Sequence, residues 1–279
     1  MTLLAIFAHP DDEAFGTGGA LARYAAAGKT VKLICATRGE SGKITDPEID
    51  SASDVAKLRE GELREACRAM GLGAPVFLDF HDSGRQERTR YDDPKALMNV
   101  DEADLERALL PHIGEIKPDI ILTFDPHGIY GHIDHIKIHR AVTAAFWSAG
   151  KVMNPAPKRL FYSVMAAERM KQMQAMRENS PLANLDPELY GVSEDSFAVI
   201  LDVSPYREQK EAAVRAHRSQ VGPSSSFAGM SDEREQEVWE RMFTQETFTL
   251  GGLRGSFPEM PTDDLFAGLE RAISGKLAL

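Results

Sequence analysis

Cysteine is scarce in this chain, which has two among its 279 residues. Cys35 lies in an apolar stretch typical of a strand and Cys67 in one typical of a helix, so we expect buried free thiols rather than a disulfide. The sequence therefore does not resemble the small, disulfide-stabilised domains of secreted proteins.

Long apolar runs are also absent. No stretch approaches the roughly 20 apolar residues that a membrane-spanning helix needs. Residues 1–7 have no charged segment ahead of their apolar stretch, which we interpret as a first strand and not as a signal peptide. We therefore expect a cytoplasmic protein with no membrane partner.

Basic residues are outnumbered by acidic ones. The chain has 32 Lys and Arg against 43 Asp and Glu, which gives a formal net charge of −11. Proteins that bind the phosphates of nucleic acids need a basic surface. We therefore expect no nucleic-acid partner, and we interpret the acidity as an aid to solubility.

Strand and helix patterns alternate through the first half of the chain. Short, continuously apolar stretches, typical of strands buried on both faces, stand between longer stretches with helical spacing. The expected strands span 3–8, 31–36, 75–80 and 119–124, and the expected helices span 18–27, 52–70, 101–116 and 132–149. This alternation predicts an α/β fold with a Rossmann-like, mostly parallel sheet flanked by helices.

The second half is less regular. Strands are expected at 158–165, 196–203 and 245–250, and helices at 205–219 and 232–243. No linker separates the two halves. We therefore expect a single domain over 1–279, in which a Rossmann-like core at 1–150 carries the chemical motifs and a smaller C-terminal elaboration at 151–279 helps to form the pocket.

The first chemical motif is His9-Pro10-Asp11-Asp12-Glu13, which begins where the first strand ends. Ligands of open parallel sheets bind outside the carboxyl ends of the strands. His and Asp suit zinc, and Pro10 stiffens the turn between the candidate ligands His9 and Asp12. The alternative is a polar turn in which an Asp caps the next helix. The motif by itself leaves both interpretations open.

The second motif, residues 125–135, follows the fourth strand and opens a helix. It contains three His and two Asp. His132 and His135 are three residues apart and share one helical face, and Asp134 between them is suited to orient an imidazole. Because the carboxyl ends of parallel strands lie at one edge of a sheet, we expect the two motifs to meet.

Together the motifs contain the parts of a metal-dependent hydrolase. Two His and one carboxylate make a three-ligand zinc site with a position left for water, and zinc lowers the pKa of that water to about 7. A spare carboxylate can accept the proton of the water. A spare His can donate a proton to the leaving amine or stabilise the oxyanion. The residues alone thus predict metal-assisted hydrolysis.

These segments resemble the hallmarks of the LmbE-like, or PIG-L-type, GlcNAc deacetylase family. Residues 8–13 match its AHPDDE motif and residues 131–135 its GHxDH motif. Residues 59–66 resemble its helix with an Arg and a Glu three apart, residues 82–84 its DSG loop and residues 215–220 its AHxSQ helix. The resemblance covers most of the chain.

The resemblance implies a metal site for one Zn²⁺ per chain. Its ligands would be His9, Asp12 and His135. Ferrous iron remains open as the native metal, since His and carboxylate ligands suit it too.

The resemblance also implies catalytic roles. Asp11 matches the family's general base, and His132 matches its general acid and oxyanion-stabilising residue. Asp134 matches the carboxylate that tunes the neighbouring His. Arg59 matches an Arg that contacts substrate, and Tyr130 a mobile Tyr of the active site.

Two polar loops, 39–51 and 82–100, are long for a compact domain, which is typical of functional loops. Arg85 stands where the family often has Met, and Arg88 and Arg90 lie in the same loop. Arg binds carboxylates and phosphates bidentately. We therefore expect Arg85 to contact substrate and residues 82–90 of this loop to face the aglycone, favouring an anionic aglycone such as malate over neutral inositol; a solvated loop is the alternative.

Three further histidines are placed by their context. We expect His127 to structure its loop or to support a ligand, and His139, one turn beyond the second motif, to pack on its helix. His217 either lines the pocket or lies on an amphipathic helix, and the sequence leaves these two open.

The predicted function is removal of the acetyl group from a small molecule that contains GlcNAc. The family resemblance points to GlcNAc-malate or GlcNAc-inositol, precursors of low-molecular-weight thiols. One alternative is a thiol S-conjugate amidase with the same machinery. Another is a non-catalytic sugar- or metal-binding protein, against which the spare base and acid argue. The sequence leaves open the oligomeric state, including whether the chain forms a homo-oligomer.

Overall fold

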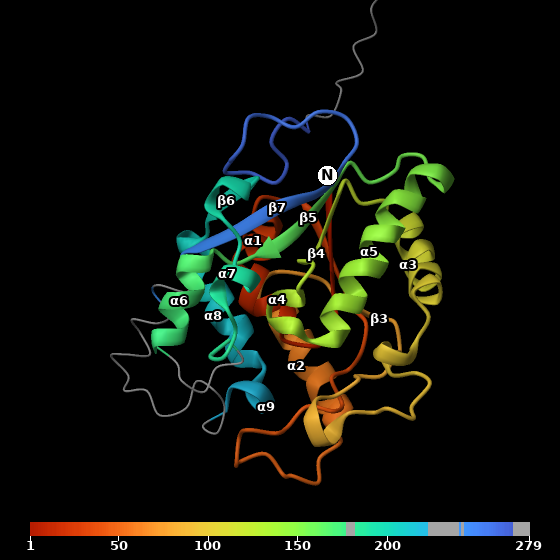
Figure 1. Ribbon diagram of the computed structural model, residues 1–279, viewed down its shortest axis with the longest axis vertical. Helices are drawn as coiled ribbons and strands as arrows, with labels where there is room; N and C mark the ends of the chain where they lie inside the picture. Colours follow the sequence, from red (N-terminus) through yellow and green to blue (C-terminus); the bar gives the residue numbers. More distant parts are fainter. Residues whose placement is uncertain (177–181, 223–239, 241–242, 270–279) are drawn as a thin grey trace, which may run out of the picture.

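A seven-stranded sheet forms the centre of the protein in the computed structural model, which describes residues 1–176, 182–222, 240 and 243–269 (Figure 1). The strand order is β3-β2-β1-β4-β5-β7-β6. The strands are β1 (Thr2–Phe7), β2 (Thr30–Cys35), β3 (Val76–Phe77), β4 (Ile120–Phe124), β5 (Arg159–Val164), β6 (Val199–Asp202) and β7 (Gln245–Leu253).

Most neighbouring strands run parallel. β1 pairs in parallel with β2 and β4, and β4 pairs in parallel with β5. β7 runs antiparallel to both of its neighbours, β5 and β6. β4 and β5 are buried along their whole length, which for β4 is what its apolar run predicts. The predicted α/β fold with a mostly parallel sheet is confirmed, and the C-terminal half extends the same sheet.

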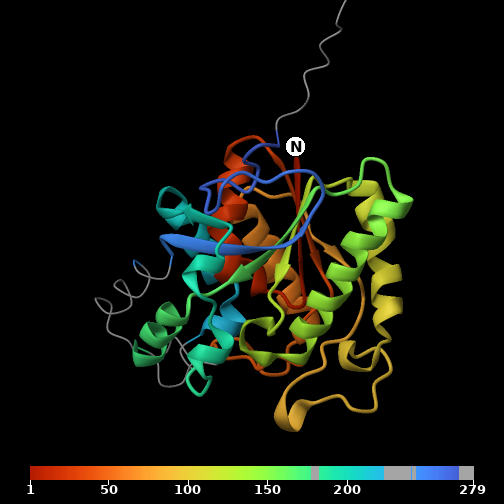
Figure 2. The ribbon, with the colours of Figure 1, turned by 45° about the horizontal axis from the view of Figure 1, so that its top comes forward.

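The helices cover the sheet in two groups (Figures 1 and 2). α1, α2 and α8 pack together, and α3 packs along α5. The described helices are α1 (Asp12–Ala26), α2 (Val55–Ala69), α3 (Glu102–Ile116), α4 (Gly128–Gly131), α5 (Ile133–Val152), α6 (Ala167–Met176), α7 (Pro187–Tyr190), α8 (Arg207–Ala216) and α9 (Arg218–Val221).

The strand order reverses between β1 and β4, because the chain winds outward from β1 to β3 and then returns to β4 on the other side of β1. In a doubly wound sheet this reversal opens a crevice at the carboxyl ends of the two strands. The first chemical motif follows β1 and the second follows β4. The topology therefore places both motifs at the same crevice.

Helix α1 begins at Asp12, six residues before the predicted start at residue 18. Glycines at 16, 18 and 19 weaken the helical signal there. Gly19 is nevertheless required by packing, since an added Cβ would lie 2.5 Å from Cβ of Val203. The close packing of α1 against Val203 thus outweighs the low helix propensity of glycine.

Two other predicted elements differ from the structure. The strand expected at 75–80 is only Val76–Phe77. The helix expected at 205–219 is broken at His217, which ends α8 and begins α9. The helix expected at 232–243 falls largely outside the described residues.

Both cysteines are buried and free, so the predicted thiols are confirmed. Within the described ranges, no helix has the length and apolar character needed to cross a membrane.

Candidate active site

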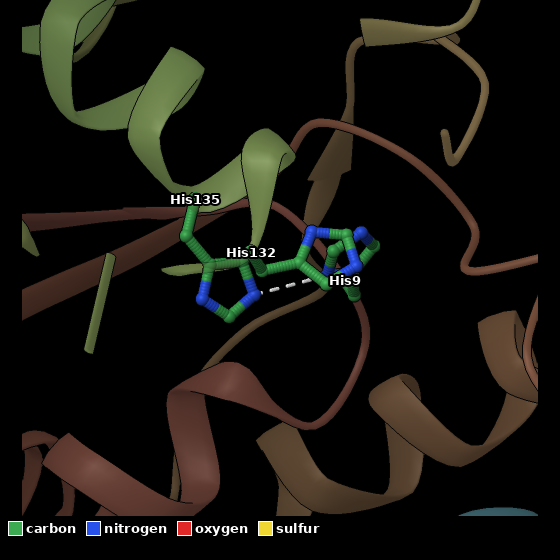
Figure 3. A group of neighbouring side chains, drawn as sticks. All are labelled: His9, His132 and His135. Atoms are coloured by element: carbon green, nitrogen blue, oxygen red, sulfur yellow. Dashed lines mark hydrogen bonds between the residues drawn. The ribbon is translucent and has the colours of Figure 1, made fainter. Parts of the chain in front are cut away.

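The two motifs lie together in one cavity of about 470 Å³. His9 follows β1, whereas His132 and His135 stand at the start of α5 beyond β4. Figure 3 shows the three rings turned toward one another. The expected meeting of the motifs at the carboxyl edge of the sheet is therefore observed.

The side chains of His9, His135 and Asp12 converge on one point. Nδ1 of His9 lies 3.2 Å from Nε2 of His135 (Figure 3) and 3.4 Å from Oδ2 of Asp12. Nε2 of His135 lies 3.2 Å from Oδ1 of Asp12. Each side chain is less than one-tenth exposed. The structure thus brings together the three residues that the sequence proposes as metal ligands.

The hydrogen bonds behind the rings indicate which nitrogens carry hydrogen. Nδ1 of His135 lies 3.1 Å from the carbonyl oxygen of Gly128, and Nε2 of His9 lies 3.0 Å from Oδ2 of Asp134. Both partners only accept, so in the neutral rings these two nitrogens carry the hydrogen. The two nitrogens that face each other then present lone pairs beside a carboxylate. This donor set fits a divalent cation with nitrogen and oxygen ligands.

The surroundings of His9 also favour positive charge. Burial acts to lower the pKa of His9, but Asp82, Asp12 and Asp134 together raise it well above the ordinary value. Two other sets of three side chains also hold potential metal-ligating atoms within 4.8 Å of one another. One set is His9, His132 and His135, and the other is His9, Asp82 and Asp134.

His132 lines the cavity with its tautomer fixed by the backbone. The N–H of Asp134 donates to Nδ1 of His132 at 3.2 Å, so Nε2 carries the ring hydrogen. Burial, reinforced by His9 and His135, lowers the pKa of His132 to about 2. The neutral ring can therefore donate a hydrogen bond from Nε2 to an oxygen in the cavity.

Asp11 also lines the cavity, with a side chain that is 21% exposed. Its Oδ2 lies 3.2 Å from Nη2 of Arg59. Burial, together with the charge of Asp12 and against the opposing charge of Arg59, raises the pKa of Asp11 to about 6. Asp11 is thus a carboxylate in the cavity that is not needed for the three-ligand group.

Asp134 contacts a different His from the one that the motif suggests. Its side chain is fully buried, and its Oδ2 meets the ring of His9 rather than that of a sequence neighbour. Oδ1 of Asp82 lies 3.4 Å from the same His9 nitrogen. The GHxDH carboxylate therefore orients the His of the other motif, and the DSG loop assists it.

Arg59 is buried and lines the cavity, as does Tyr130. Besides Asp11, the guanidinium of Arg59 donates to the carbonyl oxygens of Gly39, at 2.8 Å, and Pro10. Much of its hydrogen-bonding capacity therefore goes to fixing the loops around the first motif, in addition to any contact with a sugar.

The arginines of the 82–100 loop divide into two groups. Arg85 and Arg88 line the cavity, and the guanidinium of Arg85 lies 5.2 Å from the ring centre of Tyr130. Arg90 points elsewhere, with Nε donating to Oγ of Ser41 at 2.9 Å and Nη1 lying 3.3 Å from Asp93.

The remaining histidines lie off the cavity. His127 is exposed and packs against the ring of Tyr190, 5.2 Å away between ring centres. Nδ1 of His139 lies 2.9 Å from the carbonyl oxygen of Phe124, so this ring packs on β4. His217 does not line the cavity; it stands between α8 and α9, where it is fully buried and pairs with Glu13.

Several cavity residues escape sequence reasoning. The loop over 39–51 contributes Ser41, Lys43 and Thr45, and only its length and polarity indicated a role. An apolar wall comes from elements far apart in the chain: Phe15, Met165, Met173 and Leu182. In the sequence these apolar residues cannot be distinguished from core residues.

Comparisons with known proteins agree with this geometry. The family model described as PIG-L, GlcNAc-PI de-N-acetylase, matches residues 4–146. The 1D-myo-inositol 2-acetamido-2-deoxy-alpha-D-glucopyranoside deacetylase of Rhodococcus jostii is 33% identical over 96% of this chain and 98% of its own length. Its namesake in Saccharomonospora viridis is 34% identical over 96% of this chain and 100% of its own length.

A solved structure shares the fold. The N,N'-diacetylchitobiose deacetylase of Pyrococcus horikoshii aligns with a TM-score of 0.56 and 18% identity over 89% of this chain and 83% of its own.

Proposed function

Because the chain belongs to the PIG-L family of GlcNAc-PI de-N-acetylases, we propose that it is a zinc-dependent hydrolase that removes the acetyl group of GlcNAc-inositol. It is an enzyme of the deacetylase class, and its substrate is a small molecule that contains GlcNAc. The parts that we propose are the metal, zinc, and the aglycone, inositol.

One observation carries the proposal. The facing nitrogens of His9 and His135 lie beside Asp12 in the same cavity as a carboxylate suited to accept a proton, Asp11, and a hydrogen-bond donor, His132. A bound zinc supplies an activated water and polarises the amide carbonyl. A site built only to hold a sugar or a metal would need neither the extra carboxylate nor the extra imidazole.

The side chains then supply a base and a hydrogen-bond donor for amide hydrolysis. The Asp11 carboxylate accepts the proton of the attacking water, as its position and raised pKa allow. Nε2–H of His132 donates to the oxygen on which negative charge develops. The C–N bond breaks as the proton that Asp11 accepted passes to the leaving nitrogen, which leaves acetate and the free amine.

The aglycone is proposed from the relatives, whose names specify an inositol glycoside. Malate, the aglycone expected from the arginine loop, is the alternative to inositol, and the presence of Arg85 and Arg88 in the cavity supports it. The apolar wall of Phe15, Met165, Met173 and Leu182 favours a second candidate activity, cleavage of a thiol S-conjugate with an apolar substituent.

A substrate panel tests the proposal. Release of acetate is measured with the zinc-loaded protein on GlcNAc-inositol, GlcNAc-malate and chitooligosaccharide, and amide cleavage on a thiol S-conjugate. The Asp11→Asn protein serves as the matched control for contaminating activity. We expect the highest kcat/KM on GlcNAc-inositol. A clear preference for another member of the panel would replace the proposed aglycone.

A further inference from the structure

Asp11 holds an unusual backbone conformation. Its φ is 124° and its ψ is −29°. Residues other than glycine rarely adopt such a positive φ, and they keep it only where the surrounding structure imposes it. The contacts that impose it on Asp11 therefore also determine where its carboxylate points.

One of these contacts is a short hydrogen-bonded chain inside the protein. The N–H of Asp11 donates to Oε2 of Glu13 at 3.0 Å, and the other oxygen of that carboxylate, Oε1, lies 2.7 Å from Nε2 of His217. Glu13 is 1% exposed and His217 is fully buried. Neither residue lines the cavity, so both reach the reaction only through Asp11.

The far end of this chain is anchored in the C-terminal half. His217 stands between α8 and α9, where its carbonyl oxygen accepts from the N–H groups of Gln220, at 2.8 Å, and Val221, at 3.0 Å. Two residues on, the N–H and Oγ of Ser219 each donate to Glu62 of α2 at 2.7 Å. The segment that carries His217 is therefore fixed to α2, the helix that also carries Arg59.

We propose that Glu13 and His217 are positioning residues that hold the backbone of Asp11 so that its carboxylate faces the cavity. This inference rests on the proposed function, in which Asp11 is the general base. His217 orients Glu13, Glu13 holds the Asp11 peptide, and Asp11 alone touches the reactants.

A purely structural role explains the pair less well. An ionisable pair buried in a core is often no better for stability than apolar side chains of similar volume. Apolar side chains, however, offer no acceptor for the N–H of Asp11. The pair thus supplies a directional contact that simple filling of the core would not require.

Glutamine at position 13 separates the two explanations. Its amide oxygen can still accept from the N–H of Asp11, and its amide N–H can donate to His217 once that ring adopts its other tautomer. Glu13→Gln therefore keeps both hydrogen bonds without the charge, whereas Glu13→Ala removes both.

The test compares kcat, KM and bound metal for the wild type, Glu13→Ala, Glu13→Gln and the control Lys210→Met. Lys210 lies on α8, the helix that ends at His217, and it is buried and pairs with Glu246. Its replacement therefore disturbs that helix but leaves both hydrogen bonds of Glu13 in place. We expect Glu13→Ala to lose about 10- to 100-fold in kcat, the scale set by a misplaced reactive group, with KM and metal content kept. Glu13→Gln should recover most of that loss. Lys210→Met should lower the unfolding temperature and leave kcat near the wild-type value.

A second measurement does not depend on activity. Crystal structures of the two Glu13 variants should show that φ of Asp11 relaxes to a negative value in Glu13→Ala and stays positive in Glu13→Gln. If Glu13→Ala does not fold, His217→Leu and His217→Gln give the same comparison, because only Gln can still donate to Glu13.

Wild-type kcat in the alanine variant, or in its His217→Leu substitute, would overturn the inference. Equal losses in Glu13→Ala and Glu13→Gln, or an unchanged φ of Asp11 in the alanine variant, would do the same. A wild-type protein that deacetylates no member of the substrate panel instead overturns the proposed function, and the φ comparison still decides whether the pair holds Asp11.

Discussion

The carboxylate of Asp134 lies 3.0 Å from Nε2 of His9, although the two residues are 125 positions apart in the chain. This contact makes Nε2 the protonated nitrogen of the ring and turns Nδ1 toward His135 and Asp12. Both motifs therefore supply candidate metal ligands, and the second also supplies the carboxylate that orients a ligand of the first, so neither motif builds the site alone.

Replacement of His135 tests the metal ligands. His135→Ala leaves two of the three proposed ligand side chains, so we expect the affinity for zinc to fall by more than about 100-fold, the upper end of what loss of a supporting partner causes. The measurement is metal per chain after dialysis, by elemental analysis. His139→Ala is the matched control, because His139 lies one turn further along α5 and off the cavity. Retention of a full equivalent by His135→Ala would refute the assignment.

Asp11→Asn tests the general base. An amide cannot accept the proton of the water, so we expect kcat to fall by about 10²- to 10⁴-fold while the metal content stays at the wild-type level. Steady-state kinetics on the preferred substrate and metal analysis of the same sample give both values. Near-normal turnover by Asp11→Asn would remove Asp11 from the mechanism.

His132→Ala tests the donor to the oxyanion. Because the contact strengthens only as charge develops, we expect kcat to fall by about 10²- to 10³-fold with KM little changed. Metal content should again stay full, since His132 is not one of the three proposed ligands. Loss of the metal from His132→Ala would instead favour the alternative group in which His132 is a ligand.

Arg85→Met tests whether the 82–100 loop selects the aglycone. Arg85 lines the cavity, so we expect its replacement to lower kcat/KM for GlcNAc-malate by about 10-fold, the scale of one charge-assisted hydrogen bond, and to change GlcNAc-inositol much less. Arg90→Met is the control from the same loop, because Arg90 does not line the cavity. Equal changes for both substrates would rule out Arg85 as the residue that distinguishes them.

The Glu13–His217 pair predicts a pH-dependent stability. Burial and the charge of Arg59 act to lower the pKa of His217, but Glu13, together with Asp11, raises it above the ordinary value. A raised pKa in the folded state stabilises the fold below about pH 6.5, the pKa of an unfolded His, and this stabilisation is lost as the pH rises through the folded-state pKa. The wild type should therefore exceed His217→Gln in unfolding free energy by more at pH 5.5 than at pH 9.

Denaturant unfolding of the metal-free proteins measures that difference. Removing the metal with a chelator keeps metal binding from contributing to stability. Because titrating groups that do not interact with His217 are common to both proteins, their contributions cancel. A difference in unfolding free energy between the two proteins that stays constant from pH 5.5 to pH 9, or that grows with pH, would contradict the raised pKa of His217.

Sequence reasoning recovers the central parts of the fold because they are local or follow from topology. The apolar runs that form β1 and β4 identify buried strands, and a parallel sheet then brings His9 and His135 to one edge. The start of α1 is missed because Gly19 is selected by contact with Val203, a residue far along the chain.

The partners of individual side chains are harder to predict. The choice of His9 as the partner of Asp134 depends on ring positions that spacing within a motif does not specify. The burial of His217 against Glu13 depends on a break between two helices, which the helical pattern of the sequence does not show. Contacts of this kind arise from tertiary packing, which local sequence patterns do not predict.

β7 is made last among the described strands but lies inside the sheet, between β5 and β6. During synthesis the backbone edges of these two earlier strands therefore stay open until residues 245–253 have left the ribosome. The N-terminal strands can assemble before then, whereas closure of the sheet awaits the synthesis of β7. A ribosome that stalls shortly before residue 245 would thus release a product with two unpaired strand edges, prone to aggregate or to be degraded rather than to work at reduced efficiency.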